Sequence, residues 1–175
     1  YLDERAKEDK PFFLYFPMCP PHSPIVPAED FVGKSGMTGK EGKYADWIYQ
    51  GDDMLGQIME ALKRNGQDKN TLLIATGDNG AAGRSYTPLR DNKSSIYEGG
   101  HREPFIARWP GKIMPGSLSS QVICLNDLFA TCADLLGKDL PPDAAEDSVS
   151  ILPILLGKAK APVREATIHQ APEGL

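Results

Sequence analysis

Residues 71–80 read Thr-Leu-Leu-Ile-Ala-Thr-Gly-Asp-Asn-Gly, an apolar run that ends on adjacent acidic and amide side chains between glycines. Branched aliphatic residues in a run too short for a helix predict a buried strand over residues 71–76. Ligands of open α/β sheets bind beyond the carboxyl ends of the strands, so Asp78 and Asn79 are candidate site residues. Because Asp-Asn-Gly is also an ordinary turn sequence, the tripeptide alone leaves both interpretations open.

The spacing of apolar residues predicts the other elements of the fold. Asn65-Gly66 and Gly137 are expected to end the two helices, since Asn and Gly tolerate the left-handed conformation. The order strand, helix, strand favours an α/β fold, here a partial three-layer α/β/α sandwich with a mostly parallel sheet, because a parallel crossover needs a helix. The expected elements are helices over residues 43–65 and 125–136 and strands over residues 11–16, 71–76, 104–109 and 166–170.

Composition excludes several classes of protein. The 175 residues are 41% hydrophobic and 25% charged, as in an ordinary globular domain, and no apolar run is long enough for a membrane span. A net charge of -5 with basic residues spread along the chain argues against nucleic acid as a partner. Cys19, Cys124 and Cys132 are too few and too irregularly spaced for a disulfide framework or a zinc site. The sequence assigns no cellular compartment.

Two further side chains accompany the Asp78-Asn79 pair. His22 lies in Pro-Pro-His-Ser-Pro, just after the first predicted strand, and Lys93 lies in the long polar loop of residues 77–103. Carboxylate and amide oxygens suit a hard divalent cation such as Ca²⁺ or Mg²⁺. A cation, a lysine and a histidine around one hollow suit a sulfate or phosphate group, which carries charge on several oxygens. His22 is otherwise an ordinary loop histidine between prolines.

The motifs together resemble the arylsulfatase-type sulfatase family of the alkaline-phosphatase-like superfamily. They are P-F-F-L-Y-F with P-H-S-P, then T-L-L-I-A-T-G-D-N-G, then L-R-x-x-K-x-x-x-Y-E-G-G-x-R-x-P-F-I-x-R-W-P-G, within residues 11–157. The resemblance implies that Asp78 and Asn79 are calcium ligands and that Lys93 contacts the sulfate and steadies the leaving oxygen. It also implies that His22 contacts the sulfate and transfers a proton, a role that suits an imidazole titrating near about 6.5.

Other parts of the sulfatase pattern are absent from this sequence. The family's formylglycine is made from Cys or Ser in Cys/Ser-x-Pro-x-Arg, and residues 19–23, Cys-Pro-Pro-His-Ser, match only its first and third positions. We therefore interpret the match at Cys19 as a chance resemblance to the formylglycine motif. The early acidic pair and the lysine-histidine motif of the family are also missing. We expect residues 1–160 to be the C-terminal portion of a sulfatase catalytic domain and residues 161–175 to begin a smaller C-terminal subdomain, in a chain cut at both ends and inactive by itself.

Two rival functions remain open at this stage. One is a phosphonate monoester or phosphodiester hydrolase of the same superfamily, and the other is a non-catalytic anion-binding module. The expected partner is a sulfate-ester small molecule or a sulfated glycan, with self-association through an exposed sheet edge. Glu98 and Arg102 are interpreted as a structural ion pair, His101 as a solvated loop residue and His169 as structural.

Overall fold

The computed structural model describes residues 1–84 and 87–170 of the chain. The chain forms two compact units, Tyr1–Thr71 and Leu72–Leu175, and each is considered by itself. The first unit contains α1 (Leu2–Arg5), η1 (Glu29–Phe31), α2 (Gly39–Arg64) and η2 (Asp68–Asn70). The second contains β1 (Leu73–Thr76), α3 (Glu98–His101), β2 (Phe105–Arg108), α4 (Asp127–Leu135) and α5 (Leu152–Leu155).

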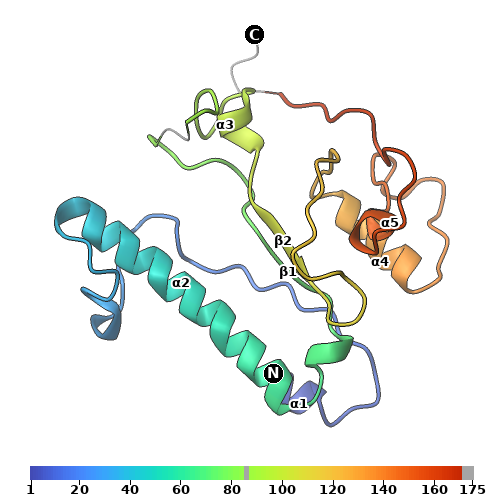
Figure 1. Cartoon of the computed structure of the whole chain (residues 1–175), viewed down its shortest axis with the longest axis horizontal. Helices are drawn as coiled ribbons and strands as arrows, with labels where there is room; N and C mark the ends of the chain where they lie inside the picture. The colour runs from blue at the N-terminus through green and yellow to red at the C-terminus, as the bar shows by residue number, and fades with distance from the viewer. Residues whose placement is uncertain (85–86, 171–175) are drawn as a thin grey trace. The chain divides into compact units, whose positions relative to one another are not determined.

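Helix α2 organises the first unit, and α1, η1 and η2 all pack against it (Figure 1). The predicted helix over residues 43–65 is confirmed, with a start a few residues earlier than expected. Its end is also confirmed, because the Asn65 N–H donates to the Ala61 carbonyl and Gly66 has a φ of 68°. Trp47 and Leu62 are the buried hydrophobic side chains of this helix.

Side chains of α2 fix the irregular segment that precedes the helix. Both oxygens of the buried Asp46 carboxylate accept backbone hydrogen bonds, from Gly33 N at 2.7 Å and from Ser35 N at 2.9 Å. The side-chain oxygen of Gln50 accepts a bond of 2.9 Å from Ala28 N. Backbone N–H groups outside helices and sheets need hydrogen-bond partners. Side chains of α2 supply acceptors for this segment.

The predicted buried strand over residues 11–16 is wrong. The segment has no regular secondary structure and pairs with no strand among residues 1–84 and 87–170, and its Phe13 and Tyr15 side chains are 75% and 77% exposed. An apolar run signals that a segment is suited to burial, whereas a strand also needs a neighbouring strand to accept its hydrogen bonds. The strand expected over residues 166–170 is likewise absent from this described segment.

The second unit is built on the β1–β2 pair, which lies centrally in Figure 1. The predicted strands over residues 71–76 and 104–109 are confirmed, but they pair antiparallel, with Leu73 opposite Arg108 and Thr76 opposite Phe105. The expected parallel arrangement is therefore not found for this pair. The described residues between the two strands, 77–84 and 87–104, contain only the short helix α3, and a parallel crossover would need a longer helix to cover the sheet.

Helix α4 confirms the predicted helix over residues 125–136 and packs against α5. The predicted stop at Gly137 is also found, with a φ of 62°. Ala130 and Ile151 are buried between these elements. The hydroxyl of Thr131 accepts a hydrogen bond of 3.0 Å from Ile151 N, which joins the two helices through a buried polar contact.

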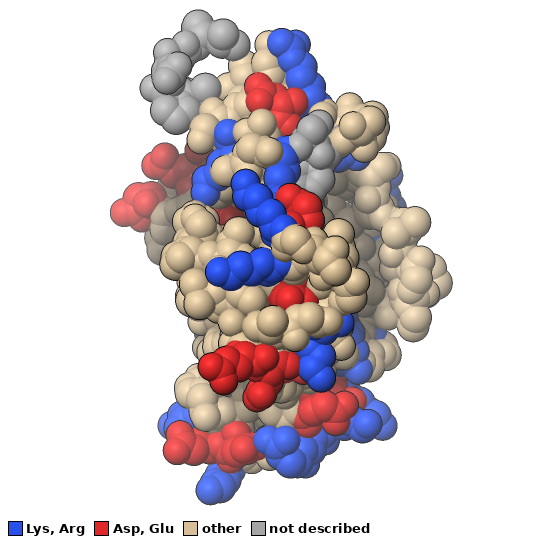
Figure 2. Space-filling model, turned by 90° about the vertical axis from the view of Figure 1, so that its left-hand side faces the viewer, with Lys and Arg blue, Asp and Glu red and all other residues tan. Residues whose placement is uncertain are grey.

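Charge is distributed without a dominant sign on the face shown in Figure 2, where basic and acidic side chains are interspersed. This pattern agrees with the net charge of -5 and offers no broad basic surface for nucleic acid on that face. None of the helices in the described part of the chain combines the length and the apolar character that crossing a bilayer requires.

Candidate functional site

The Asp78-Asn79 pair follows β1 directly, as the sequence predicted. The Asp78 side chain is exposed and that of Asn79 is half-buried. The Asn79 amide nitrogen donates to Asp78 Oδ2 at 2.6 Å. This bond uses neither Asp78 Oδ1 nor the Asn79 carbonyl oxygen, so it fixes the two side chains relative to each other while leaving an oxygen of each for a ligand.

Three glycines join this turn to the loop that carries Lys93. Gly80 N donates to Gly100 O at 2.9 Å, and Gly99 N donates to Arg90 O at 2.8 Å. A Cβ on Gly80 would overlap the Gly99 carbonyl, one on Gly99 would overlap the Asp91 carbonyl, and one on Gly100 would overlap a further carbonyl of the loop. Gly99 and Gly100 therefore let the backbone of α3 approach the backbone of the loop that carries Lys93.

Lys93 is half-buried in a strained stretch of backbone. It lies between Asp91 and Ser94, whose φ angles are 68° and 74°. Non-glycine residues adopt such angles at a cost and cluster at functional sites. Lys93 N donates to Ala81 O at 3.5 Å, so the lysine backbone lies against the chain that leaves the Asp78-Asn79 turn. Asp78, Asn79 and Lys93 thus belong to one connected part of the second unit.

Glu103 is a nearby acidic residue that sequence reasoning missed. Its carboxyl group lies against Gly77, where an added Cβ would come within 3.1 Å of Glu103 Cδ. Burial raises the pKa of Glu103, and the neighbouring Asp78 carboxylate raises it further. The antiparallel register explains the proximity, because Asp78 follows β1 at the same end of the ladder where Glu103 precedes β2. If the antiparallel pairing of the two strands had been predicted, the sequence would have placed Glu103 near Asp78.

The donor types at this turn fit a hard divalent cation. Asp78 offers a carboxylate oxygen and Asn79 an amide oxygen, and such oxygens are the usual ligands of Ca²⁺ and Mg²⁺. The carboxylates of Asp78 and Glu103 repel each other, and a cation would relieve that repulsion. In the described part of the chain no three His, Cys, Asp or Glu side chains form a metal-binding group. Ca²⁺ takes about six to eight oxygens, so these residues make part of a coordination shell.

His22 lies in the first unit, on the wall of a pocket of about 350 Å³ that Cys19 and Trp47 also line. The ring Nδ1 is 2.6 Å from the Ser23 carbonyl oxygen, which can only accept, so Nδ1 carries the proton. Nε2 of the neutral ring is then left to accept a proton or contact a ligand. The expected convergence of His22 with Asp78, Asn79 and Lys93 joins residues of different units and stays a prediction.

The remaining interpretations concern residues around the site. Cys19 is an exposed free thiol, and burial raises the pKa of the Cys132 thiol. The Glu98–Arg102 ion pair is confirmed at 2.9 Å. His101 is not simply solvated, because its ring stacks on that of His169 with centroids 3.7 Å apart.

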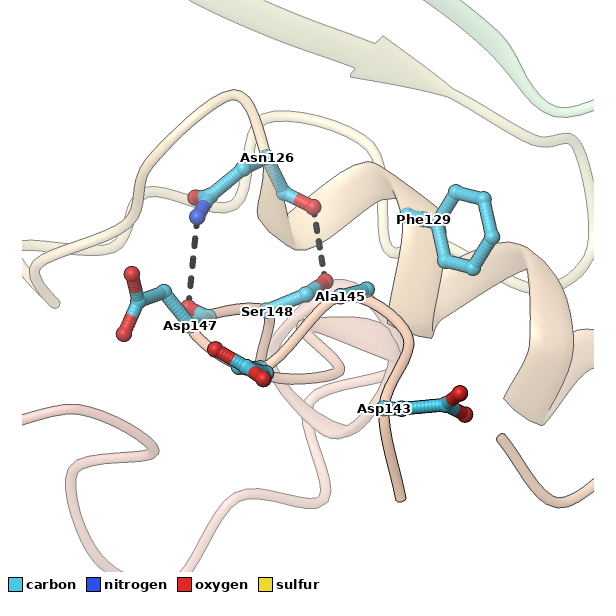
Figure 3. Close-up of a pocket in the computed structure, with 7 residues that line it drawn as sticks. Asn126, Phe129, Asp143, Ala145, Asp147 and Ser148 are labelled. Carbon is cyan, nitrogen blue, oxygen red and sulfur yellow. Dashed lines mark hydrogen bonds between the residues drawn. The ribbon is translucent and has the colours of Figure 1, made fainter. Parts of the chain in front are cut away.

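Another hollow lies elsewhere in the second unit and is shown in Figure 3. It has a volume of about 740 Å³ and is lined by α4 residues and an acidic loop that includes Asp143 and Asp147. Asn126 bonds to the Asp147 carbonyl at 3.3 Å and Ser148 to the Asn126 carbonyl at 2.7 Å, so the polar groups stabilise the loop itself. None of the predicted site residues lines this hollow, and its negative charge is unsuited to an anionic substrate.

Comparison with known proteins agrees with the class of protein that the fold and the motifs indicate. The sulfatase family model matches residues 1–138, which is most of the chain. The chain therefore belongs to the sulfatase family. The rival phosphonate monoester or phosphodiester hydrolase is not favoured by these matches.

Several curated relatives are sulfatases of defined name. The chain is 41% identical over 171 residues to an N-acetylgalactosamine-6-O-sulfatase of Bacteroides thetaiotaomicron, covering 87% of this chain and 32% of the relative. It is 36% identical to the N-acetylgalactosamine-6-sulfatase of Mus musculus, with 89% and 31% covered, and 36% identical to human arylsulfatase A, with 92% and 32% covered. The chain thus spans about a third of the length of these relatives and corresponds to a part of a sulfatase.

Solved structures support the same fold. Ps i-CgsB, in complex with k-i-k-neocarrahexaose, matches with a TM-score of 0.82 at 30% identity, covering 90% of this chain and 36% of that one. A protein described in connection with the metabolism of multiple glycosaminoglycans by Bacteroides thetaiotaomicron matches with a TM-score of 0.77 at 36% identity, with 90% and 36% covered. The alkaline-phosphatase-like α/β fold class predicted from the sequence is confirmed.

Proposed function

We propose that this chain supplies the Asp78, Asn79, Lys93 and His22 groups of a sulfatase that hydrolyses sulfate esters on glycans. The observation that carries the proposal is the glycine-mediated contact that ties the Asp78-Asn79 turn to the Lys93 loop, in a chain whose relatives are sulfatases. A cation next to an ammonium group suits a sulfate ester, which carries negative charge on several oxygens.

The proposed cation is Ca²⁺, bound through Asp78 and Asn79 together with ligands from the rest of the enzyme. Ca²⁺ tolerates irregular shells of carboxylate and amide oxygens, whereas Mg²⁺ demands near-ideal octahedral geometry. Formylglycine, which the family makes from a Cys or Ser, would supply the nucleophile. Lys93 would contact a sulfate oxygen and offset charge on the leaving oxygen, and His22 would transfer a proton through Nε2 because Nδ1 is engaged with Ser23 O.

A sulfated glycan is the proposed substrate class. Relatives of this chain are named for N-acetylgalactosamine 6-sulfate groups, and one structural neighbour was solved with a neocarrahexaose. The chain alone contains neither the formylglycine motif nor a full set of metal ligands. We therefore propose that the purified chain does not hydrolyse aryl sulfates.

A chimeric enzyme tests the proposal directly. Residues 1–175 would replace the matching segment of the Bacteroides relative, and hydrolysis of an aryl sulfate would be compared with that of an aryl phosphonate. We expect sulfatase activity that Lys93→Ala lowers by about 10²- to 10³-fold, the usual cost of losing one group that stabilises developing charge. Lys112→Ala, at an exposed turn, is the matched control.

Three outcomes would contradict the proposal. The first is a preference of the active chimera for the phosphonate, and the second is equal activity of the Lys93→Ala and Lys112→Ala chimeras. The third is hydrolysis of aryl sulfate by the purified chain, abolished by Lys93→Ala, which would show that the groups thought to be missing are not needed.

A further inference from the structure

We propose that Trp47 is a positioning residue for His22, an inference that rests on the proposed function of His22. The indole Nε1 of Trp47 donates to the His22 carbonyl oxygen at 2.9 Å. Trp47 itself is 7% exposed and lies in the N-terminal half of α2, a helix of 26 residues. A buried donor on a rigid element is therefore aimed at the backbone of the residue proposed to transfer the proton.

The His22 ring has little else to fix it. The backbone bond from His22 N to Cys19 O at 3.0 Å closes a turn, and the side chain makes its bond of 2.6 Å to the adjacent Ser23 carbonyl. Both of these contacts lie within the same short loop, so neither sets the position of the loop relative to a regular element. The Trp47 bond sets the position of the loop relative to α2, because it joins the His22 carbonyl to a side chain of that helix.

The Trp47 contact is also specific within the set of bonds that α2 makes. Asp46 holds the backbone at Gly33 and Ser35, and Gln50 holds Ala28, all in the segment that follows His22. Trp47 alone among these three reaches the histidine itself. It also lines the same pocket of about 350 Å³, so loss of its ring would alter the pocket wall as well as the hydrogen bond.

The consequence for chemistry is control of which ring nitrogen carries the proton. Holding the His22 carbonyl fixes the backbone from which the ring projects, and it keeps Nδ1 against Ser23 O, which leaves Nε2 for proton transfer. A ring that rotated away would exchange the two tautomers and lose the orientation of its proton-transfer atom. Trp47 would thereby act on proton transfer without touching substrate.

The test measures the tautomer of His22 in the full chain by ¹⁵N NMR, in the wild type, in Trp47→Phe and in the control Gln50→Ala. We expect the Nδ1–H form to dominate in the wild type and in Gln50→Ala. In Trp47→Phe its ratio to the Nε2–H form should fall by about fivefold, the equivalent of one hydrogen bond of about 1 kcal/mol. An unchanged ratio in folded Trp47→Phe, or an equal change in Gln50→Ala, would overturn the inference.

A second variant covers the case in which Trp47→Phe does not fold. Replacing both tryptophans by benzothienylalanine keeps the ring shape and removes only the N–H donor. The buried indole nitrogen of Trp109 has no hydrogen-bond partner among the described residues, so its replacement should be silent. The same fall in the Nδ1–H form is expected, and its absence would equally overturn the inference.

Activity of the chimera separates this inference from the proposed function. Trp47→Phe should lower kcat by up to about a hundredfold, as a small misplacement of a reacting group does, whereas Gln50→Ala should not. If His22→Ala leaves activity unchanged, the proposed role of His22 fails, although the tautomer ratio can still show that Trp47 positions it. If His22→Ala abolishes activity and the tautomer ratio of His22 is the same in Trp47→Phe as in the wild type, only the positioning inference fails.

Discussion

Asp127, the first residue of α4, has a fully buried carboxylate (0% exposed) that is held from three sides. It accepts backbone bonds from Cys124 N at 2.8 Å and Val149 N at 2.9 Å, and it forms an ion pair with the guanidinium of Arg164. The Asp127 carboxylate in turn raises the pKa of Arg164. One side chain thus joins α4, the loop before α5 and the segment that follows α5.

Removing this carboxylate should destabilise the second unit strongly. Asp127→Ala would leave the Arg164 charge, whose side chain is only 13% exposed, without its partner. Breaking a buried pair in this way costs about 3–5 kcal/mol in the free energy of unfolding. Urea denaturation followed by circular dichroism would measure it. Glu98→Ala, in an exposed pair, should cost no more than about 1 kcal/mol, and equal losses for the two variants would contradict this interpretation.

Asp46 should make the stability of the first unit depend on pH. Hydrogen bonds from Ser35 and from the Gly33 backbone favour its charged form and hold its pKa below the ordinary value of 3.8. A lowered folded pKa means that the unfolded chain takes up the proton first as the pH falls. The stabilisation is therefore complete above pH values near 4 and is lost as the pH falls through the folded pKa.

Urea titrations between pH 7 and pH 3 would test this dependence. Asp46→Asn should lower the midpoint at pH 7 and flatten its fall in the acid range. Asp52→Asn, at an exposed position of the same helix, is the control and should leave the curve unchanged. A wild-type midpoint that falls no more steeply than that of Asp46→Asn would contradict the assignment.

Short motifs in the sequence mark Asp78, Asn79, Lys93 and His22 as candidate site residues, and their roles stay predictions. The roles of Asp46 and Trp47 could not be read in this way, because they act through hydrogen bonds to a backbone segment that is distant in sequence. Such contacts depend on the fold, and residue type alone does not reveal them.

Among the elements, the helices were predictable and the strand pairing was not. The period of apolar residues in α2 and α4 is a local property, and Gly66 and Gly137 end the helices by their own conformational freedom. The direction of the β1–β2 pair depends on how the chain between the strands returns, and apolar runs carry no information on that path. The same limit explains residues 11–16, where the apolar pattern was recognised but a strand partner was assumed.

The packing of α3 against the Lys93 loop yields a prediction about glycine. Gly100→Ala would drive a Cβ into the Ser95 carbonyl and push the loop away, at a cost of about 1–3 kcal/mol in unfolding free energy. Gly56→Ala is the contrasting variant, because nothing lies within 4 Å of its added Cβ on α2. It should stabilise the protein by about 0.5–1 kcal/mol. Thermal melts would show opposite shifts, and a neutral Gly100→Ala would contradict the close approach.

For the whole molecule, membership of the sulfatase family settles the fold class and leaves the domain boundary as a prediction. The family match ends at residue 138, whereas we expect the catalytic portion to extend to about residue 160 and a smaller subdomain to begin at 161. The two structural units meet between residues 71 and 72. They are defined by which residues contact one another, so they do not test a boundary near residue 160.

Exposed apolar side chains predict that the purified chain self-associates. The segment of residues 11–16 presents Phe13 and Tyr15 to solvent, and Ile106 on β2 is 65% exposed. Backbone that has no strand partner, together with exposed apolar side chains in the same segment, is a ready template for pairing with a second copy. Sedimentation velocity should therefore show species larger than a monomer whose fraction grows with concentration.

Polar substitutions in the segment of residues 11–16 locate the surface responsible. Phe13 and Tyr15 are the most exposed aromatic side chains of this segment, so Phe13→Ser with Tyr15→Ser should shift the chain toward the monomer. Leu118→Ser is the control, because Leu118 is 98% exposed but stands outside any strand or extended apolar run. If the wild type sediments as a monomer at all concentrations, the surface does not self-associate. If Leu118→Ser dissociates the oligomers as well as the double variant does, they form by non-specific association of exposed apolar side chains and not by pairing of residues 11–16.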